Sequence, residues 1–208
     1  MINYNDLSIE EKKGLEKKID EAFVFTFLKP KEKRIIDFLK RIQSFELDVG
    51  FGIDKCDEQI RVINLFYASN CPLEFLFVEA CSDIYPEVNS YNRPELHLEY
   101  YDSYDIELLG KKVIEQNNID YLDIMDEENF ELVEFWENRG ELENKFLIEC
   151  WKKAKKETKT KLIGYLIASD SSGGPYFLDD EYYIWETKSV EIEEHLGKLG
   201  IEIYRKIK

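Results

Sequence analysis

The sequence has little proline or glycine and no long apolar run. Its 208 residues include 5 Pro and 10 Gly, and no stretch has the composition of a linker. We therefore expect a single domain over residues 1–208. The apolar stretches, such as residues 22–28, are far shorter than the roughly 20 residues that cross a bilayer, which predicts no membrane association.

Sequence motifs for common enzymatic chemistry are missing as well. There is no G-x-x-x-x-G-K loop, no G-x-G-x-x-G fingerprint and no G-x-S-x-G elbow. The only histidines are His97 and His195, so only two residues could act as the general base of a Ser-His-Asp triad. We expect no bound cofactor.

Cysteine use indicates a reducing environment. Cys56, Cys71, Cys81 and Cys150 form no C-x-x-C pair and lie in apolar surroundings. The first residues are polar, so we expect no signal peptide. These features predict buried free thiols and a cytoplasmic location.

Negative charge is abundant and unevenly distributed. The formal net charge is -16, and residues 44–143 hold 25 Asp+Glu against 6 Lys+Arg, a net charge of -19. Such a field repels phosphate backbones, so we expect no direct nucleic-acid binding, and it favours a basic protein partner. The alternative is that the acidity only keeps the protein soluble.

Helical spacing predicts two helices at the start of the chain. Ser8 and Glu11 have the form of a capping box, and apolar residues follow at helical spacing as far as Phe23. Pro30 suits the first turn of a second helix, whose apolar stripe ends at Ile42.

Alternating and continuous apolar patterns then predict strands, most simply as an antiparallel meander. Helices return after residue 104, and Gly140 is expected to end one of them. The last third is expected to be rich in strands, with a turn over residues 171–175 and a helix after Ser189. The expected strands span residues 45–53, 60–67, 73–78, 96–100, 162–168, 176–178, 182–185 and 201–207; the expected central helices span residues 106–116, 130–139 and 142–156.

The sequence therefore predicts an α+β fold. The expected architecture is a mostly antiparallel sheet with two N-terminal helices and a central group of helices packed on it.

One polar group in the predicted meander has the composition of a metal site. A strand over residues 95–99 would place Glu95, His97 and Glu99 on one face. One imidazole with two carboxylates can bind a divalent metal, as in a metal-dependent hydrolase. The other face of that strand is apolar, so these three side chains are more simply explained as an ordinary solvated face. We expect no metal here and keep the hydrolase as an alternative.

Tyrosines and carboxylates alternate in the acidic middle of the chain. Tyrosine provides rigid contact area with a hydroxyl, and carboxylates attract Arg and Lys of a partner. Core tyrosines with their hydroxyls at the rim would give the same pattern. The residues predicted to bind a basic partner are Glu95, Glu99, Tyr100, Tyr101, Asp102, Tyr104, Asp105 and Glu107.

Residues 167–178, which include Ser171-Ser172-Gly173-Gly174-Pro175, and then residues 183–185 resemble the late hairpin of a family of bacterial immunity proteins. The Leu-Pro segment and the Asn-Gly that such proteins carry near their start are absent. The resemblance implies an immunity or interaction role. We thus expect a binding protein that masks a basic partner, with a toxin as one form of that partner; a domain whose acidity has no target is the further alternative.

Overall fold

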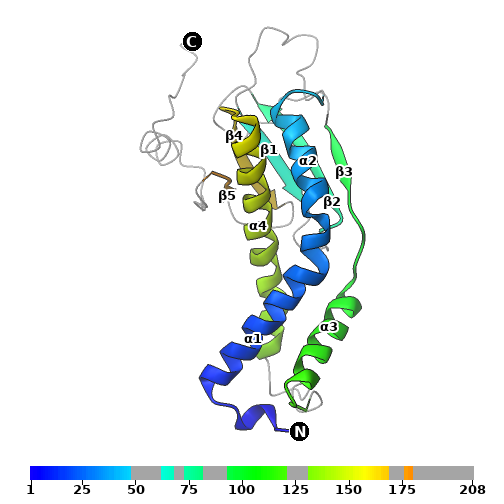
Figure 1. The fold of residues 1–208 in the computed structure, drawn as a ribbon, viewed down its shortest axis with the longest axis vertical. Coiled ribbons are helices and arrows are strands. Elements are labelled where there is room, and N and C mark those ends of the chain that lie inside the picture. The colour runs from blue at the N-terminus through cyan, green and yellow to red at the C-terminus, as the bar shows by residue number, and fades with distance from the viewer. Residues whose placement is uncertain (48–61, 68–72, 82–92, 121–130, 169–175, 180–208) are drawn as a thin grey trace. The chain divides into compact units, whose positions relative to one another are not determined.

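The computed structural model describes residues 1–47, 62–67, 73–81, 93–120, 131–168 and 176–179. They form helices and a five-stranded sheet, so the predicted α+β class is confirmed (Figure 1). The chain divides into two compact units: Met1–Glu32 with Glu99–Phe146, and Lys33–Leu98 with Leu147–Lys208. Each unit is built from two separate stretches of chain. The single domain stays a prediction.

The first unit is helical in its described part. Its longest N-terminal helix, α1, begins at the predicted capping box, in which the backbone N–H of Ser8 donates to the Glu11 carboxylate at 2.8 Å. The buried side chains of α1 are Leu15, Ile19 and Phe23, and the helix packs against α3. The elements of this unit are η1 (Tyr4–Asp6), α1 (Ile9–Phe23), the π-helical turn η2 (Val24–Leu28), the 3-10 turn η3 (Lys29–Lys31), α3 (Ser103–Gln116) and the first half of α4 (Glu131–Thr158).

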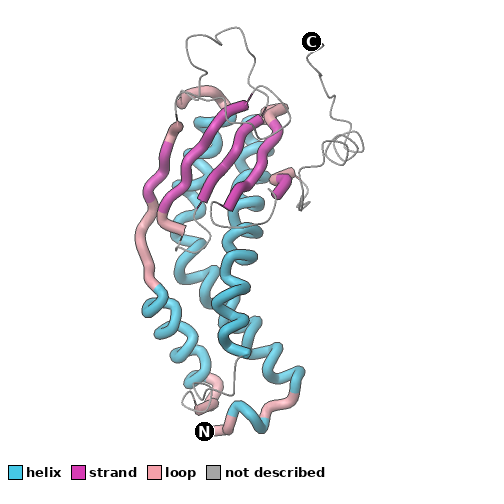
Figure 2. Tube along the Cα trace, turned by 180° about the vertical axis from the view of Figure 1, so that it is seen from behind, coloured by secondary structure: helices cyan, strands magenta, loops and turns pink. Residues whose placement is uncertain are grey.

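The second unit contains the sheet, whose strand order is β3-β2-β1-β4-β5. β1 and β4 are parallel, and the other neighbours are antiparallel. Within this unit, α2 and the second half of α4 lie over one face of the sheet, and the strands face the viewer in Figure 2. The bounds are α2 (Glu32–Gln43), β1 (Val62–Tyr67), β2 (Phe75–Cys81), β3 (Glu95–His97), β4 (Ile163–Ala168) and β5 (Tyr176–Phe177).

A glycine lets α4 (Glu131–Thr158) approach the sheet closely. A Cβ on Gly164 would lie 2.5 Å from Cζ2 of the fully buried Trp151. The Trp151 Nε1–H donates to Asp179 Oδ1 at 3.1 Å, and Lys155 Nζ donates to the same carboxylate at 2.9 Å. These bonds tie the end of α4 to Asp179, just after β5, and the absence of a side chain at position 164 of β4 makes room for the indole ring.

The opposite face of the sheet buries a row of polar side chains. Asn64 in β1 pairs in register with Glu79 in β2 and with Tyr165 in β4, so the three side chains point the same way. All three are buried. Burial raises the pKa of the Glu79 carboxyl, and the charge of Arg93, whose Nε lies 2.7 Å from Oε1, opposes that rise.

The predicted break at Gly140 is wrong, because α4 runs through it without interruption. A glycine inside a helix costs only about 1 kcal/mol relative to alanine. It ends a helix when the backbone turns left-handed, and at Gly140 the helical backbone continues. One helix therefore replaces the two that were predicted over residues 130–156.

The strand predicted over residues 45–53 does not start where the alternation starts. Phe45 has φ of 55° and lies in the turn that ends α2. Residues 48–53 lie outside the described residues. A left-handed turn is incompatible with an extended strand, whatever the apolar pattern.

The next predicted strands are confirmed. β1 and β2 lie within or beside residues 60–67 and 73–78, and β3 starts the predicted 96–100 strand but ends at His97. β1, β2 and β3 are antiparallel neighbours, as expected for three of the four strands of the predicted meander. β4 and β5 match the strands expected over residues 162–168 and 176–178. The elements expected over residues 171–175 and from 182 onwards lie outside the described residues.

Cys150 is a buried free thiol, as predicted. Cys56, Cys71 and the side chain of Cys81 lie outside the described residues. Within the described ranges, no helix combines the length and the apolar character needed to cross a membrane.

Candidate functional site

The eight residues predicted to bind a basic partner divide between the two units. Glu95 belongs to β3 in the second unit, whereas the seven from Glu99 to Glu107 belong to the first. They are therefore treated as two separate regions.

Asp102 and Asp105 stabilise the start of α3. Asp102 is the N-cap, and its Oδ1 accepts from the backbone N–H of Asp105 at 2.8 Å. The carboxylate of Asp105 accepts in turn from the backbone N–H of Asp102 at 3.0 Å. This reciprocal pair satisfies two helix-end donors, so both carboxylates have a structural task that the sequence pattern did not reveal.

Tyr101 belongs to the core of the first unit and not to its surface. Its ring stacks on Phe27 at 4.6 Å between centroids and meets Phe23 edge to face at 5.9 Å. The Tyr101 hydroxyl donates to Oε1 of the buried Glu143 at 2.7 Å, and the ammonium of buried Lys31 lies 4.2 Å from its ring centroid. A tyrosine enclosed in this way cannot contact a partner.

The remaining residues leave an exposed aromatic and acidic surface at the start of α3. Tyr100 is 64% exposed and Tyr104 is 62% exposed. Glu99 and Asp105 are exposed beside them in the sequence, and Glu107 is half-buried. Residues 99–110 contain four carboxylates and no Lys or Arg, so this segment is locally negative.

Leu108, which the sequence reasoning missed, extends this surface. It is 46% exposed and lies four residues after Tyr104, so the two share one side of α3. Its exposure could have been inferred because Ile106 and Val113 already supply the buried side of the helix. We call Glu99, Tyr100, Tyr104, Asp105 and Leu108 the α3 patch.

Glu95 lies in a different electrostatic setting. It lines a groove of about 400 Å³ in the second unit, together with Arg34 and Arg41 of α2. Asp37 and apolar side chains complete the lining. Because cations and carboxylates alternate there, this groove does not favour a basic partner.

The alternative metal site is not assembled in the described part of the chain. His97 is exposed, and its Nε2 lies 3.8 Å from Glu95 Oε2. Glu99 falls after the end of β3 and belongs to the first unit. Among the described residues, no group of three potential metal ligands is close enough to hold an ion.

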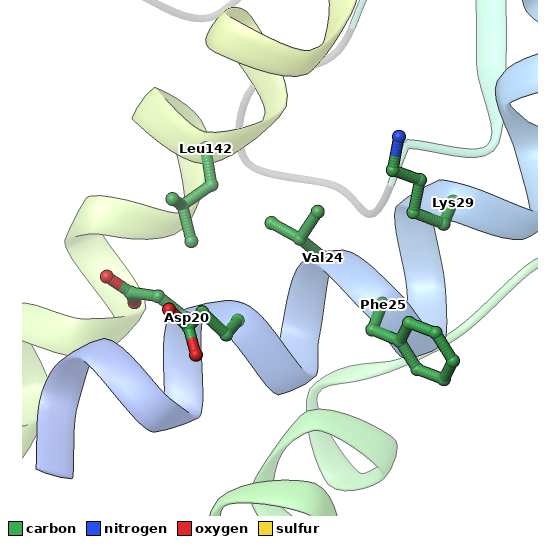
Figure 3. Close-up of a pocket in the computed structure, with 6 residues that line it drawn as sticks. Asp20, Val24, Phe25, Lys29 and Leu142 are labelled. Carbon is green, nitrogen blue, oxygen red and sulfur yellow. The ribbon is translucent and has the colours of Figure 1, made fainter.

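A groove in the first unit lies at the end of α1. It has a volume of about 340 Å³, and Val24 and Leu142 point towards each other across it (Figure 3). Asp20 lies at one end of the groove, and Phe25 and Lys29 lie at the other. Glu21 completes the lining.

Burial raises the pKa of the Asp20 carboxyl. The positive charge of Lys145 lowers it and the negative charge of Glu21 raises it further, but neither effect is as large as burial. The groove therefore pairs an apolar wall with a carboxylate that is partly removed from water.

Comparisons with protein-family models, with curated proteins and with solved structures found no match for this chain.

Proposed function

We propose that this chain is a cytoplasmic binding protein that presents the α3 patch to a basic protein partner. The observation that carries the proposal is the exposure of Tyr100, Tyr104 and Leu108 within a segment that has carboxylates and no cations. Exposed large aromatic side chains are what interfaces use as anchors, and the surrounding carboxylates steer a partner of opposite charge.

The proposed surface is smaller than the one predicted from the sequence. Tyr101 is buried and the capping Asp102 is half-buried, whereas Asp105 belongs to the same cap but is exposed. The proposed surface therefore consists of the exposed aromatic and aliphatic side chains with Glu99 and Asp105 at their edge. Apolar contacts at the centre with charges at the rim are the usual arrangement of protein interfaces. In the cell, the basic partner would be a toxin whose surface this protein masks.

The experiment uses the tagged full chain as bait in extracts of its own host at low salt. A patch variant, Tyr104→Ser with Leu108→Gln, removes the apolar centre. A charge control, Asp6→Asn with Glu46→Gln, removes two exposed carboxylates outside the patch. We expect wild type and control to retain the same basic protein and the patch variant to lose it.

The captured protein is then identified by mass spectrometry, purified and mixed with the purified chain. Raising the salt concentration should weaken the complex because the attraction is partly electrostatic. Retention of the partner by the patch variant, or a partner that is not basic, would contradict the proposal.

A further inference from the structure

The outer strand of the sheet, β3, bonds to β2 along one edge only. It stands at one end of the strand order and forms the outer margin of the sheet in Figure 2. The carbonyl of Pro94 accepts a hydrogen bond from β2, and the N–H of Leu98 donates one to the residue that precedes β2. In an antiparallel pair, every second residue directs both backbone groups to its neighbour. Leu96 therefore also faces β2, whereas Glu95 and His97 face the opposite way.

Three backbone groups of β3 are left open on that outer edge. The Nη2 of Arg34 donates to the carbonyl of His97 at 2.7 Å, in agreement with the outward direction of this carbonyl. Within the described part of the chain, no hydrogen bond reaches the N–H or the C=O of Glu95, or the N–H of His97. An edge with unpaired donors and acceptors is a template for another strand.

The side chains on this edge select the strand that fits. Glu95 and His97 are exposed, and ionisable side chains on an edge usually discourage pairing. A second copy, laid antiparallel with Leu96 on a two-fold axis, places Glu95 of each copy opposite His97 of the other. An imidazole N–H can donate to a carboxylate, so these cross-strand pairs attract each other. The same register lets the open backbone groups of the two copies bond to each other.

The groove beside β3 is also self-complementary in charge. It is lined by two arginines, one aspartate and one glutamate, and Leu96 of β3 lies there beside Phe38 of α2. Because the lining holds both signs in equal number, it suits a partner that also carries both better than a strongly basic or strongly acidic one. In the two-fold register, the half-buried Leu96 side chains of the two copies meet each other.

We propose that β3 pairs with β3 of a second copy of this chain, antiparallel and in the register centred on Leu96. Such a two-fold contact uses the same residues on both copies and closes after two. β3 is short, so the dimer forms at high protein concentration. None of the strand's residues belongs to the α3 patch, so this pairing does not depend on the proposed function.

The test begins with sedimentation equilibrium of the full chain, from dilute solution through the millimolar range. Amide hydrogen exchange of the labelled protein, followed by NMR at low and at high concentration, locates the contact. We expect a monomer–dimer equilibrium, and slower exchange of the Glu95 and His97 amides at high concentration. The amide of Leu96 is the internal control, because it faces β2 in the monomer and in the dimer alike.

One backbone variant removes an open donor and leaves the sheet intact. His97→Pro deletes an N–H that faces away from β2, and proline is tolerated at such edge positions. It should weaken the dimer about tenfold or more, because each copy loses a hydrogen bond. The matched control His97→Ala keeps the N–H and loses only the imidazole, so it should weaken the dimer about two- to fivefold. The amide spectrum of dilute protein checks that each variant is folded.

A charge exchange tests the register. Glu95→Lys and His97→Glu should each weaken the dimer about tenfold when alone, because each replaces an attractive cross-strand pair by a repulsive one. An equal mixture of the two variants should dimerise about as well as wild type. In the mixed dimer the new lysine faces the new glutamate, and the unchanged His97 faces the unchanged Glu95.

The results that would overturn the proposal are distinct. A monomer throughout the concentration range would exclude the pairing. A dimer that His97→Pro leaves as strong as wild type, or one that does not slow exchange of the Glu95 and His97 amides, would place the contact elsewhere. A mixture that dimerises no better than either variant alone would overturn the register centred on Leu96.

Discussion

Among the residues whose burial is described, each unit buries one glutamate, and the two are held in different ways. Glu143 in the first unit is fully buried, accepts a hydrogen bond from buried Tyr101 and lies 3.8 Å from Arg139, whose side chain is only 12% exposed. Glu79 in the second unit is also buried, but its partner Arg93 is 56% exposed.

The two glutamates therefore differ in whether the arginine that pairs with the carboxylate is shielded from water. Tyr101 and Arg139, which are partners of Glu143, are largely shielded from water. Removal of the carboxylate would therefore leave the tyrosine hydroxyl without its acceptor and the guanidinium without its counter-charge. Around Glu79 the arginine can return to water. The same segment that supplies Tyr101 to this core also supplies Tyr100 and Tyr104 to the surface, so one tyrosine-rich stretch serves two purposes.

The largest expected effect separates the two glutamates directly. Glu143→Leu should lower the free energy of unfolding by about 3–5 kcal/mol, because it leaves a buried guanidinium unpaired. Glu79→Leu should change it by about 0–1 kcal/mol, because the exposed Arg93 is readily solvated. Urea unfolding of both variants checks this. Equal losses would remove the distinction between the two buried carboxylates.

Two glycines, Gly164 in the sheet and Gly140 in α4, differ in the space around them, and alanine substitutions test that difference. Gly164→Ala should destabilise the protein by about 1–3 kcal/mol, because the new Cβ would meet Trp151 at 2.5 Å. Gly140→Ala should stabilise it by up to about 1 kcal/mol, because no described residue beyond the adjoining turns of α4 lies within 4 Å of the new Cβ and alanine favours the helix. The melting temperatures of the two variants check these predictions. A lower melting temperature for Gly140→Ala would mean that the helix is strained at this position.

Substitution of Asp102 tests how much the N-terminal cap of α3 contributes to the stability of the first unit. Asp102→Ala should cost about 1 kcal/mol because the backbone N–H of Asp105 loses its acceptor. Asp102→Asn keeps a side-chain oxygen and should cost much less. A stabilising Asp102→Ala would contradict the capping role of Asp102.

The smallest expected effect concerns pH. Burial raises the pKa of Asp20, so the folded protein holds this proton more tightly than the unfolded chain does. The charged carboxylate therefore costs stability at neutral pH, and the cost disappears as the pH falls through the raised pKa to below the ordinary value. Asp20→Asn should raise the melting temperature slightly at about pH 7 and leave it unchanged near about pH 3. An unchanged melting temperature at both values would mean that Asp20 is well solvated.

Local patterns in the sequence predicted much of the described fold. The capping box at Ser8 and the strands β1, β2 and β4 were recognisable because each depends on residues close together in the chain. The parallel pairing of β1 with β4 could not be predicted, since it joins residues about a hundred positions apart. The predicted helix end at Gly140 was wrong because the helix-forming residues on both sides outweigh the cost of a single glycine.

Alternation of tyrosine and acid singled out residues 99–107 in the sequence. It could not tell buried Tyr101 from exposed Tyr100, because that depends on where Phe23, Phe27 and Glu143 pack. The groove beside Asp20 was not foreseen at all. It needs Leu142, which lies more than a hundred residues further along the chain.

The central claim is that the α3 patch binds a basic protein partner, and one affinity measurement tests it most directly. Calorimetry would compare the dissociation constants of the captured partner for wild type, for Tyr104→Ser with Leu108→Gln, and for the control Asp6→Asn with Glu46→Gln. The account predicts at least about a tenfold loss of affinity for the patch variant, as for the loss of an interface anchor. It predicts less than about a twofold change for the control. Equal affinities for the patch variant and wild type would contradict the claim.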